Sequence, residues 1–232
     1  MSALSKNARV AGLLYILASV VGLLRLMYIP EALFVRGNAT ATANNIAAHE
    51  ALFRWGIVSL LLGSALWIFV PLALYRLLKE VDPTLAVMMV ILGSLMQVPL
   101  FFVNAVIDAA ALLFARSADF LSVFDKPQHD AFVRLFLNLH HQLDLANAIF
   151  WGMWLFPFGL LVYKSRFLPR FLGVWLVIAC FAWLAFSLTG LLLPAYEDKV
   201  LSISQPLALG EVATMLWLAI MGAKGKRLPA AA

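Results

Sequence analysis

The chain has 232 residues, of which 64% are hydrophobic and only 12% are charged, and its formal net charge is +5. A soluble domain carries about 25% charged residues, and its core could not absorb so much apolar side chain. The composition therefore excludes an ordinary soluble protein and indicates an integral membrane protein. The apolar segments follow one another without a long polar insert, so we expect a single domain over residues 1–232.

Six apolar segments are long enough to cross a bilayer as helices. A spanning helix needs about 20 mostly apolar residues, and lipid offers no hydrogen-bond partner to backbone outside a helix or a closed barrel. The alternating pattern of a lipid-facing barrel strand does not occur in these segments. The predicted spanning helices are residues 8–29, 51–78, 84–115, 143–163, 169–193 and 206–222. The predicted fold class is all-α, a polytopic bundle of six membrane-spanning helices.

Basic residues gather on one side of this predicted topology. With six spans, the two termini share a side with the second and fourth loops, and this side carries ten basic and two acidic residues, a net charge of +8. Because basic loops stay in the cytoplasm, we expect both termini there and the protein in a bacterial inner membrane. The same asymmetry explains the sequence pI of about 9.6 without a nucleic-acid partner, so the expected partners are membrane lipids.

The two long connections lie on the opposite, outer side. In the first, residues 41–48 are predicted to form a short helix that Thr40 or Thr42 caps. In the second, residues 130–143 mix apolar and polar side chains at helical spacing, which predicts an outward extension of the fourth helix. Residue counts along the second and third helices also place their outer ends beyond the bilayer.

Two residues of opposite charge fall inside predicted spans. Arg25 lies 16 residues after Arg9, or about 24 Å along a helix, and Glu211 lies 13 residues before Lys224, or about 20 Å. A charge within the membrane calls for a partner or a role. We therefore predict an ion pair between Arg25 and Glu211 that joins the first and last helices, either as a tie between them or as part of a binding layer.

A second polar layer lies at the outer boundary of the predicted bundle. His140 and Asp144 are four residues apart and share a helix face, as do Glu50 and Arg54. The candidate ligand-binding residues are Glu50, Arg54, Asp108, His140, Asp144 and Asn147. This set predicts an outward-facing polar pocket that binds a small molecule, a lipid headgroup or an ion, in a carrier or an accessory subunit.

Two other functions stay open at this point. Imidazole and carboxylate ligands suit zinc, so His140, Asp144 and Asp108 could serve a membrane-embedded metal-dependent hydrolase, although no metal is expected because the neighbouring His140 and His141 face different directions. Alternatively, the polar residues only tie the helices, and any activity belongs to a partner chain. No lysine falls at mid-span and the histidines lie at or beyond the outer boundary, so we expect no retinal, no haem and no other cofactor.

Several short motifs resemble one family when they are taken in chain order. They are residues 8–15, residues 41–46, residues 163–173, and Gly210-Glu211 followed by Leu216-Trp217-Leu218. Together they resemble the bacterial membrane family called "domain of unknown function 4386", over most of the chain. The resemblance implies the membrane topology, and it implies no activity, cofactor or catalytic residue.

Overall fold

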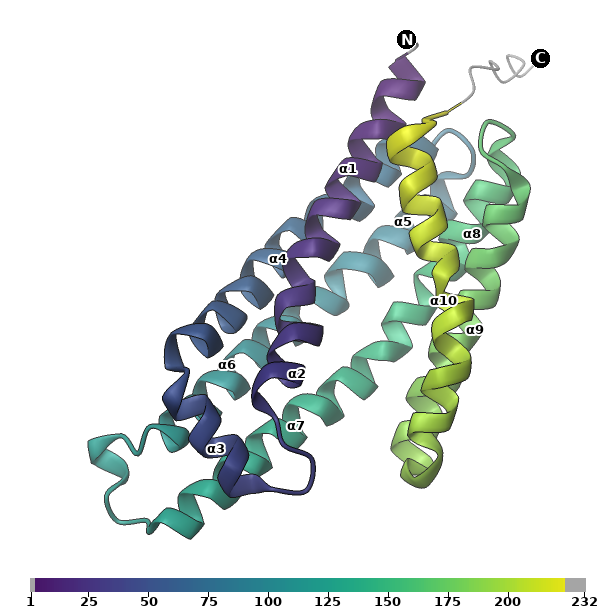
Figure 1. The fold of residues 1–232 in the computed structure, drawn as a ribbon. Coiled ribbons are helices and arrows are strands. Elements are labelled where there is room, and N and C mark those ends of the chain that lie inside the picture. Colours follow the sequence, from purple (N-terminus) through teal and green to yellow (C-terminus); the bar gives the residue numbers. More distant parts are fainter. Residues whose placement is uncertain (1–2, 224–232) are drawn as a thin grey trace, which may run out of the picture. The chain divides into compact units, whose positions relative to one another are not determined.

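The computed structural model describes residues 3–223, which form helices joined by short connections and contain no strand (Figure 1). Six of the described helical segments are long and apolar enough to cross a membrane. They are Ala3–Leu33, Glu50–Leu78, Pro83–Ala115, Lys126–Ser165, Arg170–Leu192 and Pro194–Ile220. This confirms the predicted all-α class with six membrane-spanning helices.

Several spans are built from more than one helix. In the first half of the chain the elements are α1 (Ala3–Leu23), the π-helix η1 (Leu24–Tyr28), α2 (Ile29–Leu33), α3 (Ala39–Ala48), α4 (Glu50–Leu78), α5 (Pro83–Val90), the π-helix η2 (Ile91–Leu95) and α6 (Gln97–Ala115). In the second half they are η3 (Asp119–Leu121), α7 (Lys126–Met153), α8 (Leu155–Ser165), α9 (Arg170–Leu192), η4 (Pro194–Tyr196) and α10 (Glu197–Ile220).

Two local predictions differ from the structure. The last helix begins at Glu197 rather than at Pro206, which lies inside α10. Acidic residues favour a helix start, and α10 has Glu197 and Asp198 in its first turn, whereas the internal proline removes only one backbone hydrogen bond. The short outer helix α3 is capped by Asn38, whose side chain accepts a hydrogen bond from the backbone N–H of Ala41, and the hydroxyl of Thr42 contacts the backbone of Val35 instead.

The chain divides into two compact units, each made of discontinuous segments. Unit 1 comprises Met1–Leu17, Leu66–Gln97 and Leu145–Ala232, and unit 2 comprises Ala18–Ala65 and Val98–Asp144. The single domain expected from the sequence stays a prediction.

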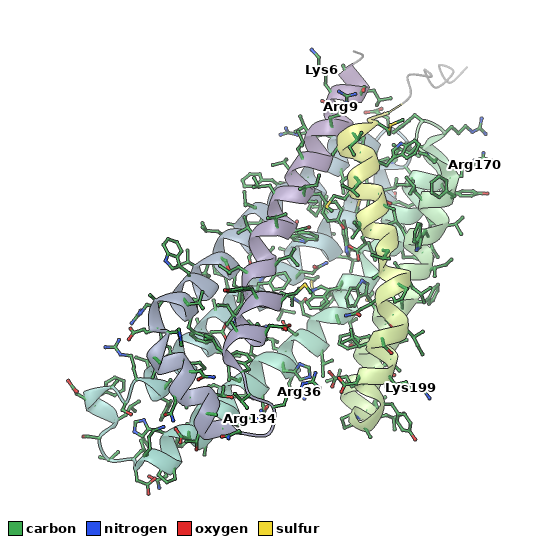
Figure 2. The ribbon with its side chains drawn as sticks, in the orientation of Figure 1. Lys6, Arg9, Arg36, Arg134, Arg170 and Lys199 are labelled. Carbon is green, nitrogen blue, oxygen red and sulfur yellow. The ribbon has the colours of Figure 1, made fainter. Side chains whose placement is uncertain are left out.

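In unit 1, close helix packing depends on glycines at helix contacts. A Cβ atom on Gly159 of α8 would lie 2.7 Å from the carbonyl oxygen of Gly173 in α9, and one on Gly12 of α1 would lie 2.3 Å from the backbone nitrogen of Ala219 in α10. A Cβ on Gly222, just after α10, would lie 2.6 Å from the hydroxyl oxygen of Ser5, so the start of α1 and the end of α10 are neighbours. Figure 2 shows Lys6, Arg9 and Arg170 at this end of unit 1 and Lys199 at the opposite end.

An ion pair joins two connections at the same end of unit 1. Lys164, at the end of α8, donates a hydrogen bond of 2.9 Å to Asp82, which precedes α5. The other carboxylate oxygen of Asp82 accepts from the backbone N–H of Leu85 and so caps α5. The hydrogen bond from Lys164 lowers the pKa of Asp82 below its usual value, and the backbone bond acts in the same direction.

The glycine contact between α8 and α9 leads to a stability prediction. We expect Gly173→Ala to destabilise the protein by about 1–3 kcal/mol, because its Cβ would lie 2.6 Å from the carbonyl oxygen of Gly159. The matched control is Gly22→Ala in α1, where a Cβ would meet no atom within 4 Å, and better helix propensity should be neutral or stabilising by up to about 1 kcal/mol. Thermal unfolding of the purified variants in detergent measures both, and equal midpoints would refute the close contact.

Candidate functional site

A buried ion pair between Arg25 and Asp108 forms the centre of unit 2. The Nε atom of Arg25 donates to Oδ2 of Asp108 at 2.6 Å, and Nη2 donates to Oδ1 at 2.7 Å. The side chains are 5% and 0% exposed, respectively. Two parallel, charge-assisted bonds of this kind fix both direction and distance, so each charge has the partner that its burial demands.

The π-helical turn η1 carries Arg25 toward this partner. In η1 the backbone N–H of Ile29 bonds to the carbonyl of Leu24, five residues earlier, so the turn holds one residue more than an α-helical turn. Such turns change the direction of the side chains that they carry and recur at functional sites. The rings of Phe34 and Phe53 lie 5.6 and 6.0 Å from the guanidinium carbon of Arg25. These rings cover the cation with apolar surface and add a cation–π attraction.

His140 of α7 links the ion pair to a second carboxylate. Its Nδ1 atom lies 2.9 Å from Oδ1 of Asp108 and 3.2 Å from Nη2 of Arg25. Its Nε2 atom lies 3.3 Å from Oδ2 of Asp144, one turn further along α7. The imidazole is only 8% exposed. Both ring nitrogens therefore face carboxylate oxygens inside the unit.

Asn104 of α6 completes the group. Its Nδ2 atom donates to Oδ1 of Asp144 at 2.7 Å, whereas its buried Oδ1 atom has no hydrogen-bond partner in the described part of the chain. Asp144 is 21% exposed and is the more accessible of the two carboxylates in contact with His140. We call Arg25, Asn104, Asp108, His140 and Asp144 the polar cluster. It draws on the first, third and fourth spans.

The structure brings together three of the predicted ligand-binding residues, Asp108, His140 and Asp144. Arg25 joins them, although residue counting placed it in a different layer. Counting along a straight helix locates a backbone position, but it takes no account of the length of an arginine side chain or of a π-helical turn. Arg25 thus has Asp108 as its partner where we expected Glu211, and Glu211 accepts hydrogen bonds from Tyr15 and Trp183 in unit 1.

The remaining predicted residues have other surroundings. Arg54 bonds to Glu50 at 2.6 Å and Arg116 lies 3.5 Å from the same carboxylate oxygen, so these half-exposed side chains form a separate surface group. Asn147 belongs to unit 1 and is fully buried, and neither side-chain polar atom has a hydrogen-bond partner among the described residues. A role for Asn147 in ligand binding stays a prediction.

The polar cluster does not have the form of a metal site. Among residues 3–223, no group of three histidine, cysteine, aspartate or glutamate side chains is arranged to hold a metal ion. Both oxygens of Asp108 already bind the Arg25 cation, which would repel a second cation at the same place. The set of His140, Asp144 and Asp108 therefore gives little support to a metal-dependent hydrolase.

The buried ion pair can be tested by a double-mutant cycle. We expect Arg25→Gln and Asp108→Asn each to destabilise the protein by about 3–5 kcal/mol, because each leaves the other charge buried without a partner. The double variant should lose clearly less than the sum of the two. The control is Arg54→Gln in the exposed pair with Glu50, which should cost about 0–1 kcal/mol. Unfolding in detergent measures all four variants, and an Arg25→Gln effect no larger than the control would contradict the pairing.

Comparisons with known proteins identify a family and name no activity. No curated protein and no solved structure matches the chain. A family model described as "Domain of unknown function (DUF4386)" matches residues 10–222, which is nearly the whole chain and includes every member of the polar cluster. The chain belongs to this family of unknown function.

Proposed function

We propose that the protein is a multi-pass protein of the bacterial inner membrane that binds and releases a proton at the polar cluster, as a carrier or as an accessory subunit of one. The observation that carries the proposal is the placement of His140 between two carboxylates and beside a guanidinium, all in segments apolar enough to span a membrane. Ionisable side chains at such positions typically belong to ion pathways and proton relays. Of the ligands considered above, an ion fits this geometry best.

The contacts of His140 suit both protonation states of its ring. In the charged state both nitrogens donate, Nδ1 to Asp108 and Nε2 to Asp144. In the neutral state Nε2 can still donate to Asp144, while Nδ1 accepts from Nη2 of Arg25 at 3.2 Å. When the ring gains or loses a proton, the hydrogen-bond partner of Nδ1 therefore changes between Asp108 and Arg25, and the side chains can keep their positions.

The charges of the cluster favour the uptake of one proton. Arg25 offsets Asp108, so a neutral His140 leaves the cluster with the single negative charge of Asp144. Protonation of His140 removes that net charge, which is favourable in an apolar surrounding. Asp144 is the more accessible carboxylate, and the Oδ1 atom of Asn104 beside it has no hydrogen-bond partner among the described residues, so we place proton entry at Asp144.

The proposal includes an orientation in the membrane. The net charge of +8 on the side of the termini favours a cytoplasmic location for both of them, which places the polar cluster in the outer half of the bilayer. Helices α4, α6 and α7 would then extend into the outer aqueous phase. In this orientation the cluster exchanges protons with the external medium.

Cysteine labelling tests this orientation. In a Cys180→Ser background, Lys6→Cys and Asp119→Cys each introduce one thiol at an exposed position. We expect a membrane-impermeant maleimide to label Asp119→Cys in intact cells and Lys6→Cys only after the cells are permeabilised. The reverse pattern would invert the orientation, and labelling of both in intact cells would contradict a six-span topology.

Nitrogen NMR of histidine in lipid nanodiscs tests proton binding. We expect the ring signals that disappear in His140→Gln to change with pH, because histidine is the side chain that most readily changes its charge near neutral pH. His49→Gln, which changes an exposed histidine outside the polar cluster, is the control and should leave those signals in place. A ring that keeps one protonation state over the whole range in which the protein stays folded would favour the alternative, in which the cluster only ties the helices.

A further inference from the structure

A second carboxyl group lies deep in a spanning helix, in unit 1 and apart from the polar cluster. Glu211 is 14 residues from the start of α10 and 9 residues from its end, or about 21 Å and 14 Å along the helix. The sixth membrane-spanning segment therefore carries an ionisable side chain near its middle. The proton site proposed above does not use this residue.

The two oxygens of Glu211 each have one neutral donor. The hydroxyl of Tyr15 in α1 donates to Oε2 at 2.6 Å, and Nε1 of Trp183 in α9 donates to Oε1 at 2.9 Å. Tyr15 is the titratable group that contacts the carboxyl, since the indole of Trp183 does not ionise. Among the described residues, no lysine, arginine or histidine contacts Glu211.

Neighbouring contacts pack the helices that carry the two donors against α10. On the α9 side, Nε1 of Trp175 donates to the carbonyl of Leu207, one turn before Glu211, at 2.9 Å. A Cβ on Gly210 would lie 2.6 Å from the Trp175 ring, so the absence of a side chain there lets the indole reach the backbone of α10. On the α1 side, Gly12 packs against Ala219 in the same way. The carboxyl is thus held between two fixed helices.

Aromatic rings surround this site. The Tyr15 ring lies 5.3 Å from that of Trp67 and 5.9 Å from that of Trp154, and the Trp183 ring lies 5.4 Å from that of Trp151. An isolated carboxylate is strongly disfavoured in such an apolar place, and a group without a counter-ion usually becomes neutral there. Arg25 supplies the opposite charge to Asp108 in unit 2, but within residues 3–223 no equivalent cation contacts Glu211.

We propose that Glu211 is a second proton-binding site, which holds a proton as a neutral carboxylic acid and exchanges it with water without a cationic partner. Proton uptake takes the side chain from a charge of −1 to 0. In the protonated form the carboxyl O–H donates to the oxygen of Tyr15, and Oε1 still accepts from Trp183. This site stands independently of the polar cluster, because none of its contacts involves a residue of unit 2.

Infrared spectroscopy of the protein in lipid provides the direct test. The carbonyl stretch of a protonated carboxylic acid is distinct from the bands of a carboxylate. At neutral pH, we expect the wild type to show such a band and Glu211→Gln to lose it. Glu50→Gln is the control, because Glu50 lies at the surface beside Arg54, and this variant should keep the band. Identical spectra for the wild type and Glu211→Gln would overturn the proposal.

Chemical modification gives a second, independent readout on the unmodified chain. A hydrophobic carbodiimide adds to a protonated carboxyl, so we expect the peptide containing Glu211 to gain the mass of one reagent molecule, with a yield that falls as the pH rises. Tyr15→Phe removes a hydrogen bond that favours the carboxylate and should move this fall to higher pH. A yield that does not depend on pH, or no response to Tyr15→Phe, would count against a proton at Glu211.

Discussion

An unpartnered charge is unstable in the apolar interior of a membrane-spanning bundle, and this constraint accounts for the arrangement of the polar residues in each unit. Arg25 and Asp108 meet it by pairing, with two short hydrogen bonds and almost no exposed surface. Glu211 has neutral donors on both oxygens and, in the part of the chain that the structure describes, no cation beside it. The chain therefore accommodates buried ionisable groups in two ways. Asp108 has an opposite charge beside it, whereas Glu211 has only neutral hydrogen-bond donors among the described residues.

The elements that lipid physics dictates could be predicted from the sequence, whereas the partners of the buried side chains could not. The spans follow from the length of apolar runs, because backbone groups in lipid must bond within their own helix. The predicted start of the last helix is wrong because a proline such as Pro206 often begins a helix. The acidic residues Glu197 and Asp198 in the first turn are the sequence signal for the observed start. The Asn38 cap of α3 was equally readable, since asparagine is a preferred capping residue.

Counting residues along the helix could not identify Asp108 as the partner of Arg25, for a physical reason. Depth along a helix does not give rotation about it, and the π-helical turn from Leu24 to Tyr28 changes that rotation just where Arg25 lies. Nothing in the local sequence marks such a turn. The histidine and aspartate at positions 140 and 144 could be grouped correctly because one turn of a regular α-helix separates them. Sequence reasoning therefore succeeds within a regular helix and fails where an irregular turn decides which helix a side chain meets.

The first span contributes one residue to each of the two sites. Tyr15 contacts Glu211 in unit 1, and Arg25, ten residues later in the same span, binds Asp108 in unit 2. In the two proposed proton sites, a proton on His140 would change whether Nδ1 contacts Arg25 or Asp108, and a proton on Glu211 would reverse the hydrogen bond to Tyr15. Each exchange would alter one contact of the first span within its own unit. Such local exchanges avoid the cost of separating a buried charge from its partner.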